Sequence, residues 1–190
     1  YKRQPYRRKT PSVSDAISDL PKINPPDNGS DEMNYTSQKL TEYQRKLRTN
    51  CKKLYNHWCA KHSPEVVETI RHIPPGESLV TVWDRLPSHV KVRYNSPSKI
   101  HSNIYKRLKW SGFSPTIVHP RRAMLIHPDQ NRILSVREAA RLQGFPDRFR
   151  FYGGRSSQYQ QVADAVPPPL AEAVGCALMD LLADLGVIST

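Results

Sequence analysis

Four side chains between positions 51 and 62 are of the types that bind zinc, namely Cys51, His57, Cys59 and His62. Zinc ligands usually form two close pairs separated by a longer loop. Here all four fall within 12 residues, and Cys51 shares the apolar face of a predicted helix. A core cysteine beside a histidine-rich helix end explains the same residues. We favour that interpretation and assign no metal-binding residues; the zinc content of the purified protein distinguishes the two.

A second group of candidate residues is basic. The segment 85–128 contains nine Lys or Arg residues and no acid, with four aromatic residues interleaved. This mixture suits contacts to phosphates together with packing by aromatic rings, so it indicates nucleic-acid binding more than a merely solvated basic face. Which of these residues contact phosphates and which read bases is left open. The candidate DNA-binding residues are Arg93, Lys106, Arg107, Arg121 and Arg122.

The charge of the chain is unevenly distributed. The 190 residues carry 29 Lys and Arg against 17 Asp and Glu, a formal net charge of +12. No Lys or Arg follows Arg155, so residues 1–155 carry +16 and the last 35 residues carry −4. The sequence has no run of 18 apolar residues, no visible signal peptide and only three cysteines. We therefore expect a basic intracellular protein with a polyanionic partner and no membrane contact.

Periodicity and turn residues predict the elements that must position these side chains. Apolar residues at helical spacing predict helices over 13–20 and 38–55, separated by a loop that runs from Pro21 through Ser30. Ser63-Pro64-Glu65 predicts the start of a helix that ends near Ile73.

Further along, two short strands, 116–118 and 123–126, are predicted on either side of a basic turn. Ser135 and Glu138 have the spacing of a capping box, which predicts a helix that ends at Gly144. Three prolines precede a last helix with a leucine-rich apolar face.

Three stretches of the sequence together resemble the DNA cytosine-C5 methyltransferases. Residues 135–147, SVREAARLQGFPD, resemble motif IX of that family, and residues 158–171, QYQQVADAVPPPLA, resemble motif X. The segments 105–108 and 114–118 are similar to the end of the family's target-recognition region. Weaker matches lie upstream in the family's order, at 15–21, 56–57 and 73–76.

The family's earlier catalytic motifs are not found in the sequence. The family attacks cytosine with a thiolate from a Pro-Cys-Gln loop, and none of the three cysteines here follows a proline. The glycine-rich cofactor loop, Glu-Asn-Val and Gln-x-Arg-x-Arg are also missing. The resemblance therefore implies that this chain holds no catalytic residue, is inactive alone and needs an N-terminal catalytic half.

The resemblance also implies roles for particular residues. The residues implied to contact S-adenosyl-L-methionine are Asp164, Ala165 and Val166. The family usually has Gly-Asn immediately before this Ala-Val pair, whereas this chain has Ala-Asp. A packed structural helix explains motif IX nearly as well as its role in the family does. We therefore expect the polar residues of this motif to anchor loops. Those residues are Arg137, Glu138, Arg141 and Gln143.

The expected fold class is α+β, with an irregular target-recognition region and C-terminal helices that complete the Rossmann-like methyltransferase domain of the N-terminal half. We predict a link at 1–37, a DNA-binding target-recognition region at 38–132, and a motif IX and X segment at 133–190. The expected partners are double-stranded DNA and the catalytic half, encoded with this chain or separately, in the nucleus. The alternative is a stand-alone or degenerate DNA-binding module without catalysis.

Overall fold

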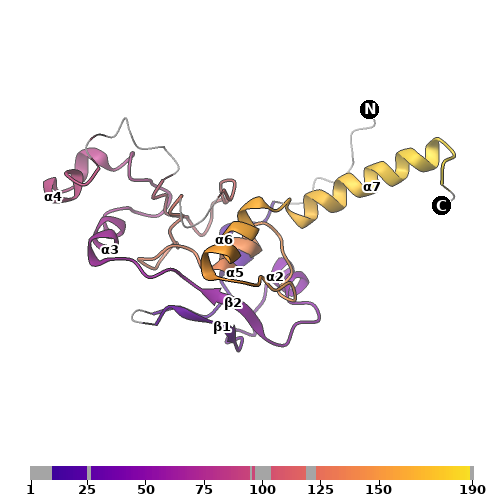
Figure 1. The fold of residues 1–190 in the computed structure, drawn as a ribbon, viewed down its shortest axis with the longest axis horizontal. Helices are drawn as coiled ribbons and strands as arrows, with labels where there is room; N and C mark the ends of the chain where they lie inside the picture. Colours follow the sequence, from indigo (N-terminus) through magenta and orange to yellow (C-terminus); the bar gives the residue numbers. More distant parts are fainter. Residues whose placement is uncertain (1–9, 25–26, 95, 97–103, 119–122, 189–190) are drawn as a thin grey trace.

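The computed structural model describes residues 10–24, 27–94, 96, 104–118 and 123–188. These residues form mostly short helices and one small sheet, against which α5 packs, and long irregular segments connect the elements (Figure 1). The elements, in chain order, are α1 (Val13–Ile17), β1 (Gly29–Met33), α2 (Glu42–Leu47), β2 (Leu54–Trp58), α3 (Pro64–Arg71), η1 (Trp83–Arg85), α4 (Ser88–Lys91), α5 (Val136–Leu142), α6 (Arg155–Asp164) and α7 (Pro168–Asp184).

Strands β1 and β2 form an antiparallel pair in which Gly29 lies opposite Trp58. Gly29 has a positive φ of 81°, and a Cβ added there would lie 2.1 Å from the carbonyl oxygen of His57. Glycine is therefore required at this close approach of two backbones. The predicted loop from Pro21 through Ser30 is wrong at its end, because β1 begins inside it.

The predicted helix over 38–55 is also too long. A capping box between Thr41 and Gln44 starts α2, which ends at Leu47. Asn50 then adopts a positive φ of 57°, which turns the chain, and β2 begins at Leu54. The predicted helix was too long because the buried Leu54 continues the apolar spacing past this turn, although it belongs to a strand.

Two groups of buried apolar residues form the core. The larger group joins α1, β2, α5 and α6, and includes Leu54, Trp58, Leu134 and Tyr159. The smaller group lies under α3 and α4, where Ile70, Leu79 and Val90 meet Ile126. In Figure 1 the α3 and α4 region forms one end of the molecule and the sheet lies near its centre.

The predicted strands at 116–118 and 123–126 do not form a hairpin in the described residues. Ile126 instead makes single bridges to Arg107 and Ile133, which lie outside the predicted hairpin. Isolated bridges fix the path of an irregular chain without building a ladder. The basic turn between the two segments, 119–122, lies outside the described residues.

The C-terminal part contains one predicted and one unpredicted helix before the last one. The predicted helix α5 is confirmed, with Gly144 after it at a φ of 85°. Helix α6 was not predicted, because its polar face gives it little apolar periodicity. The ring of Pro169, at the start of α7, lies so close to Gly144 that an added Cβ there would be 2.6 Å away.

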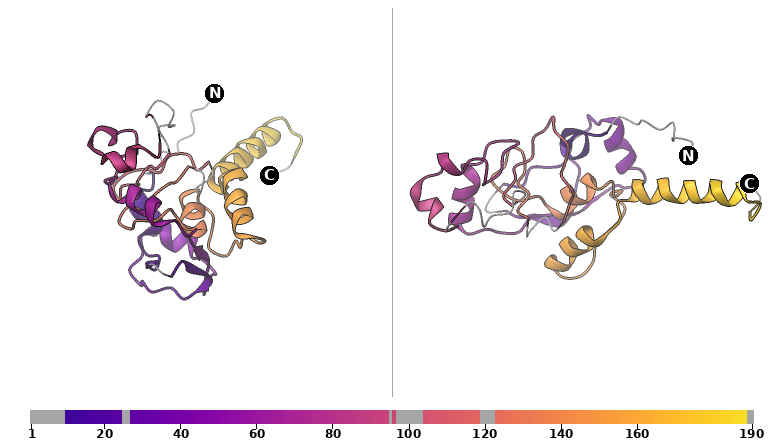
Figure 2. Two further views of the ribbon diagram at one scale, coloured as in Figure 1. Left: turned by 60° about the vertical axis from the view of Figure 1, so that its left-hand side comes forward. Right: turned by 90° about the horizontal axis from the view of Figure 1, so that it is seen from above.

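Helix α7 extends away from the rest of the molecule (Figures 1 and 2). None of its residues is buried, and Leu178, Leu181 and Leu185 are between 53% and 67% exposed. By length and composition alone, the stretch Arg155–Asp184 contains an 18-residue window that is apolar enough to cross a membrane, with a mean hydropathy of 1.3. The extended Ala165 separates this stretch into two helices, α6 and α7.

Candidate functional site

The capping box of α5 places the polar residues of the predicted motif IX. The Ser135 hydroxyl accepts from the backbone N–H of Glu138 at 3.0 Å, and Oε2 of Glu138 accepts from the backbone N–H of Ser135 at 2.7 Å. This reciprocal pair is the one that the spacing predicted. It fixes the first turn of α5 in the middle of the larger core group.

A bidentate ion pair lies beside this cap. Arg132 donates to both carboxylate oxygens of Glu138, at 2.7 and 2.8 Å, and both side chains are buried. Burial alone would raise the pKa of Glu138, but the guanidinium of Arg132 outweighs it and holds that pKa below its ordinary value. Burial lowers the pKa of the neighbouring His127 to about 4. His127 is therefore neutral at pH 7.

Arg141 is the centre of a second buried ion pair. It donates to the two oxygens of Asp147 at 2.8 and 2.6 Å, to Asp19, and to the carbonyl oxygen of Ala16 at 3.0 Å. The hydroxyl of Tyr35 also donates to Asp147, at 2.6 Å. Burial would raise the pKa of Asp147, but the hydrogen bonds and charge of Arg141 hold it below its ordinary value. This network joins three segments that lie far apart in the sequence.

Arg137 and Gln143 bind mainly backbone groups. Arg137 donates to the carbonyl oxygens of Tyr55, Pro146 and Phe149. Gln143 donates to the carbonyl oxygen of Val162, at 2.7 Å. The side chains of α5 thereby hold β2, the loop before α6 and α6 itself against one another. The guanidinium of Arg137 and the amide nitrogen of Gln143 are therefore used in structural contacts, whereas the buried side-chain oxygen of Gln143 accepts no hydrogen bond.

The three candidate cofactor-binding residues lie between α6 and α7. Asp164 ends α6 and is exposed, and its Oδ1 accepts from the side chain of Gln160 at 2.7 Å. Ala165 has extended backbone with a ψ of 143°. Val166 is exposed. The segment is an open edge next to the base of α7, with no second wall in the described residues.

The candidate DNA-binding residues are separated by the fold. Arg93 is exposed beside α4 and donates to the carbonyl oxygen of Glu65 at 2.6 Å, while Lys106 is half-buried. Arg107 is buried, and its guanidinium donates to four backbone carbonyls and to Asn131. Its donors are used inside the protein, so Arg107 is not proposed as a DNA contact. Arg121 and Arg122 lie outside the described residues.

The four potential zinc ligands take different positions. Both ring nitrogens of His57 are hydrogen-bonded, one to the Ser135 hydroxyl at 2.9 Å and one to the carbonyl oxygen of Pro21 at 2.8 Å. Cys51 is directed to the carbonyl oxygen of Lys53. Cys59 is buried, and burial raises its pKa to about 11. Among the described residues, no three His, Cys, Asp or Glu side chains come together as metal ligands would.

Comparison with known proteins decides the family. The model of the C-5 cytosine-specific DNA methylases matches residues 2–180. The chain belongs to this family. The methylase family thus extends over nearly all of the sequence, including the irregular region between the two best motifs.

The relatives of this chain are much longer than the chain itself. It is 33% identical to DNA (cytosine-5)-methyltransferase 1 of Mus musculus over 233 residues, covering 90% of this chain and 14% of the mouse protein. It is 35% identical to DNA (cytosine-5)-methyltransferase 1B of Oryza sativa over 196 residues, covering 90% of this chain and 12% of the rice protein. The chain thus spans a small part of both relatives.

A solved structure has a similar fold. It is a putative DNA modification methyltransferase encoded within a prophage of E. coli, with a TM-score of 0.64 and 27% sequence identity. The similarity covers 90% of the present chain and 47% of that chain. The observed mixture of helices with a small sheet is therefore the fold of a corresponding part of a DNA methyltransferase.

Sequence reasoning missed several residues that build the site. Arg132, Asp147 and Asp19 complete the two buried ion pairs, and none was singled out. The available signal was spacing, because both Arg132–Glu138 and Arg141–Asp147 pair an arginine with an acid six residues later. The exposed arginines before α6 were also not considered.

Proposed function

We propose that this chain is the DNA-recognition and closing portion of a DNA cytosine-C5 methyltransferase. In this proposal, residues 1–37 are a link, residues 38–132 contact double-stranded DNA, and residues 133–190 return to the catalytic domain. The observation that carries the proposal is α7, which has a leucine-rich face and no buried residue. At about 1.5–3 kcal/mol for each fully buried large apolar side chain, such a helix is strongly stabilised by a protein partner. The catalytic half of the enzyme is that partner, encoded with this chain or as a separate subunit.

The residues proposed to bind the cofactor could form one wall of its pocket. Asp164, Ala165 and Val166 lie at the base of α7, where a docked catalytic half would face them. When bound, S-adenosyl-L-methionine would supply the methyl group. The carboxylate of Asp164 is acceptable near its cationic sulfonium, but it accepts hydrogen bonds where the family's Asn can also donate. We therefore expect this wall to bind the cofactor less tightly than the family's usual sequence.

The surroundings of the cysteines support the proposal that this chain alone is inactive. A catalytic cysteine needs a depressed pKa, so that the thiolate forms near neutral pH. The pKa of the buried Cys59 is instead raised to about 11. Cys51 is directed to a backbone carbonyl, and Cys176 lies on the exposed surface of α7. Cys59 therefore does not have the surroundings of an activated nucleophile.

The nucleus is the proposed location, because the two long relatives named above, from Mus musculus and Oryza sativa, are from eukaryotes and DNA is the proposed substrate. The runner-up is a DNA-binding module or degenerate copy without catalysis in any context. The replacement of Gly-Asn by Ala163 and Asp164 favours it.

The test is reconstitution. The 190-residue chain, a separately produced catalytic half with a Pro-Cys-Gln loop, and their mixture are each given duplex DNA and radioactive S-adenosyl-L-methionine. We expect methyl transfer only in the mixture, and we expect Arg93→Gln to weaken duplex binding by the chain. Turnover by the chain alone would contradict its inactivity. Duplex binding without methylation in the mixture would favour the runner-up.

A further inference from the structure

A loop rich in arginine and aromatic residues precedes α6. Residues 148–155 read RFRFYGGR, with three arginines, three aromatic residues and no acid. Tyr152 is 70% exposed, and all three arginines are exposed. Neither the structural network around α5 nor the proposed duplex contact uses these exposed side chains. They require a separate explanation.

Two of the arginines lie over aromatic rings of β2. The Arg150 guanidinium is 3.5 Å from the centroid of the Tyr55 ring, and that of Arg155 is 4.8 Å from the Trp58 ring. Cation–π contacts of this kind hold a guanidinium in place while its outer face stays in solvent. A guanidinium held in this way presents a positive, planar surface that needs little further ordering on binding.

Next to these arginines the surface is hollowed. A hollow of about 340 Å³ is lined by Tyr55, Arg150, Tyr152 and Gly153, and by two acidic strand residues, Asp31 and Glu32, among others. Glu32 is paired with Lys53 at 3.8 Å. Its volume lies in the range of small-ligand sites, about 300–1,000 Å³. The lining residue Gly153 has no side chain, so a ligand in the hollow can approach its backbone. The hollow therefore has room for a flat group next to a cationic rim.

These features match the chemistry of unpaired nucleotides. Proteins bind single strands by stacking bases on aromatic rings and guanidinium planes while arginines neutralise phosphates. Duplex DNA keeps its base faces inside the stack and cannot use such a surface. The carboxylate of Asp31 can accept from the exocyclic amino group of a base. A cationic peptide fits less well, because Arg150 already covers the Tyr55 ring and the loop carries only positive charge.

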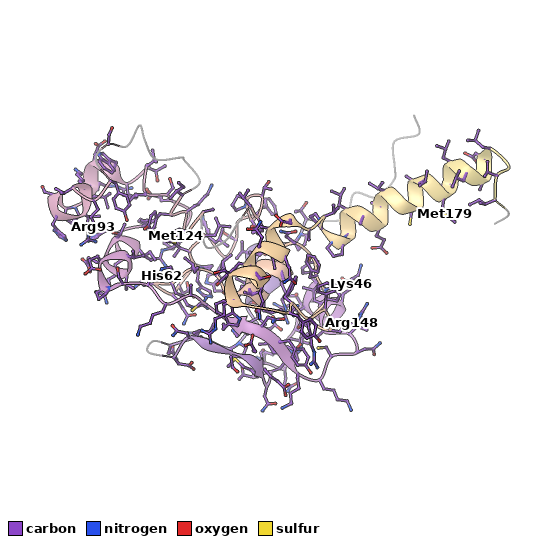
Figure 3. The ribbon with its side chains drawn as sticks, viewed as in Figure 1. Lys46, His62, Arg93, Met124, Arg148 and Met179 are labelled. Carbon is purple, nitrogen blue, oxygen red and sulfur yellow. The ribbon has the colours of Figure 1, made fainter. Side chains whose placement is uncertain are left out.

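We propose that the loop 148–155 and the hollow beside β2 bind single-stranded nucleic acid, with an unpaired base in the hollow and phosphates along the arginines. This site is separate from the proposed duplex contact. Figure 3 shows Arg93 at the α4 end of the molecule and Arg148 far from it, near Lys46 of α2. The inference goes beyond the proposed methyltransferase role and does not depend on it.

The test measures the affinity of the full 190-residue chain for a labelled 12-nucleotide single strand, as DNA and as RNA, and for the matching DNA duplex. Tyr152→Ala is expected to weaken single-strand binding about tenfold and to leave duplex binding within about twofold. Tyr152→Phe keeps the ring and is expected to retain affinity. Arg150→Gln is expected to lower the slope of log affinity against log salt by about 0.7. Comparison of the DNA and RNA strands identifies which source of unpaired bases is preferred.

Arg93→Gln is the matched control, since it removes an exposed arginine at the other end of the molecule. It is expected to weaken duplex binding alone. The proposal is overturned if Tyr152→Ala leaves single-strand affinity unchanged, or if Arg93→Gln lowers it as much as Arg150→Gln does. It is equally overturned if a polyarginine peptide, and not a single strand, binds in a Tyr152-dependent manner. Unchanged urea midpoints for all variants show that folding is not the cause.

Discussion

Helix α5 has two arginines and a glutamate among its seven residues, and all three are buried. Helix α7 has 17 mostly apolar residues, and none is buried. The two helices lie close together in the sequence and meet where Pro169 packs on Gly144. One is polar and buried, whereas the other is apolar and exposed.

The difference follows from the partners available to each helix. Every charged side chain of α5 is matched by an opposite charge or by carbonyl groups, and that pairing is what makes burial of ions tolerable. No residue of α7 is buried, and Leu170, Leu178 and Leu181 are 53–55% exposed. Large exposed apolar faces of this kind mark interaction sites. The polarity of a helix therefore predicts its burial poorly here. Substitutions that remove the partners of α5 or alter the exposed face of α7 test this comparison.

The largest expected effect is at Arg141. Arg141→Ala leaves the buried carboxylates of Asp147 and Asp19 without their main partner. Removal of one member of a buried ion pair costs about 3–5 kcal/mol in the free energy of unfolding. Urea unfolding followed by circular dichroism measures this loss. Arg45→Ala, an exposed arginine on α2, is the control and should change stability by less than about 0.5 kcal/mol. Equal losses would show that burial of α5 does not depend on pairing.

A smaller effect is expected from pH. The folded-state pKa of His127 is about 4, below its ordinary value of 6.5, because the side chain is buried. Between these values the unfolded chain binds a proton that the folded chain does not, so stability falls as pH is lowered from 6.5 to 4, by at most about 3 kcal/mol. The pKa of His57 is lowered too, so it contributes in the same direction.

His127→Asn isolates this contribution. The amide oxygen of Asn can accept the backbone N–H groups that Nδ1 of His127 accepts, but it does not titrate. The free energy of unfolding of this variant, measured in urea at several pH values, should depend less on pH between 6.5 and 4. Glu138 and Asp147, with lowered pKa values, stabilise the fold above their ordinary pKa near 4 and lose this contribution only at lower pH. An unchanged slope would contradict the role of His127.

The smallest effect on stability is expected on α7. Leu181→Glu alters an exposed side chain and should change the free energy of unfolding by less than about 0.5 kcal/mol. The same variant should abolish methyl transfer in the reconstituted mixture if α7 docks on the catalytic half. Leu134→Ala, at a fully buried position, is the matched control and should cost about 2–5 kcal/mol. A large loss of stability in Leu181→Glu would mean that α7 already packs within this chain.

The sequence predicted the parts of this fold that depend on local signals. The capping box of Ser135 and Glu138, the stop at Gly144 and the start of the last helix are read from neighbouring residues, and all three occur. The pairing of β1 with β2 depends on residues that lie far apart, and the end of α2 depends on a turn at Asn50 that no apolar pattern shows. Those elements were missed or misplaced.

For the site, too, features set by neighbouring residues were predictable and features set by the whole fold were not. Asp164 and its two neighbours were placed from motif X alone, and the structure adds that they lie at the base of α7. Arg107 had the right chemistry for a phosphate, but only the folded chain shows that its donors serve carbonyl groups. Local sequence gives the type of a side chain, whereas burial and partners come from the whole fold.

The contact between Gly144 and Pro169 has a mechanical consequence. Helix α7 is 17 residues long, so it forms a rigid arm of about 25 Å that is hinged at this contact. A side chain at position 144 would collide with the proline ring and tilt the arm. A tilt of about 10° at this contact moves the far end by about 4 Å, which is about three quarters of the rise of a helical turn. The missing methyl group of one glycine thus sets the angle at which α7 leaves the rest of the molecule.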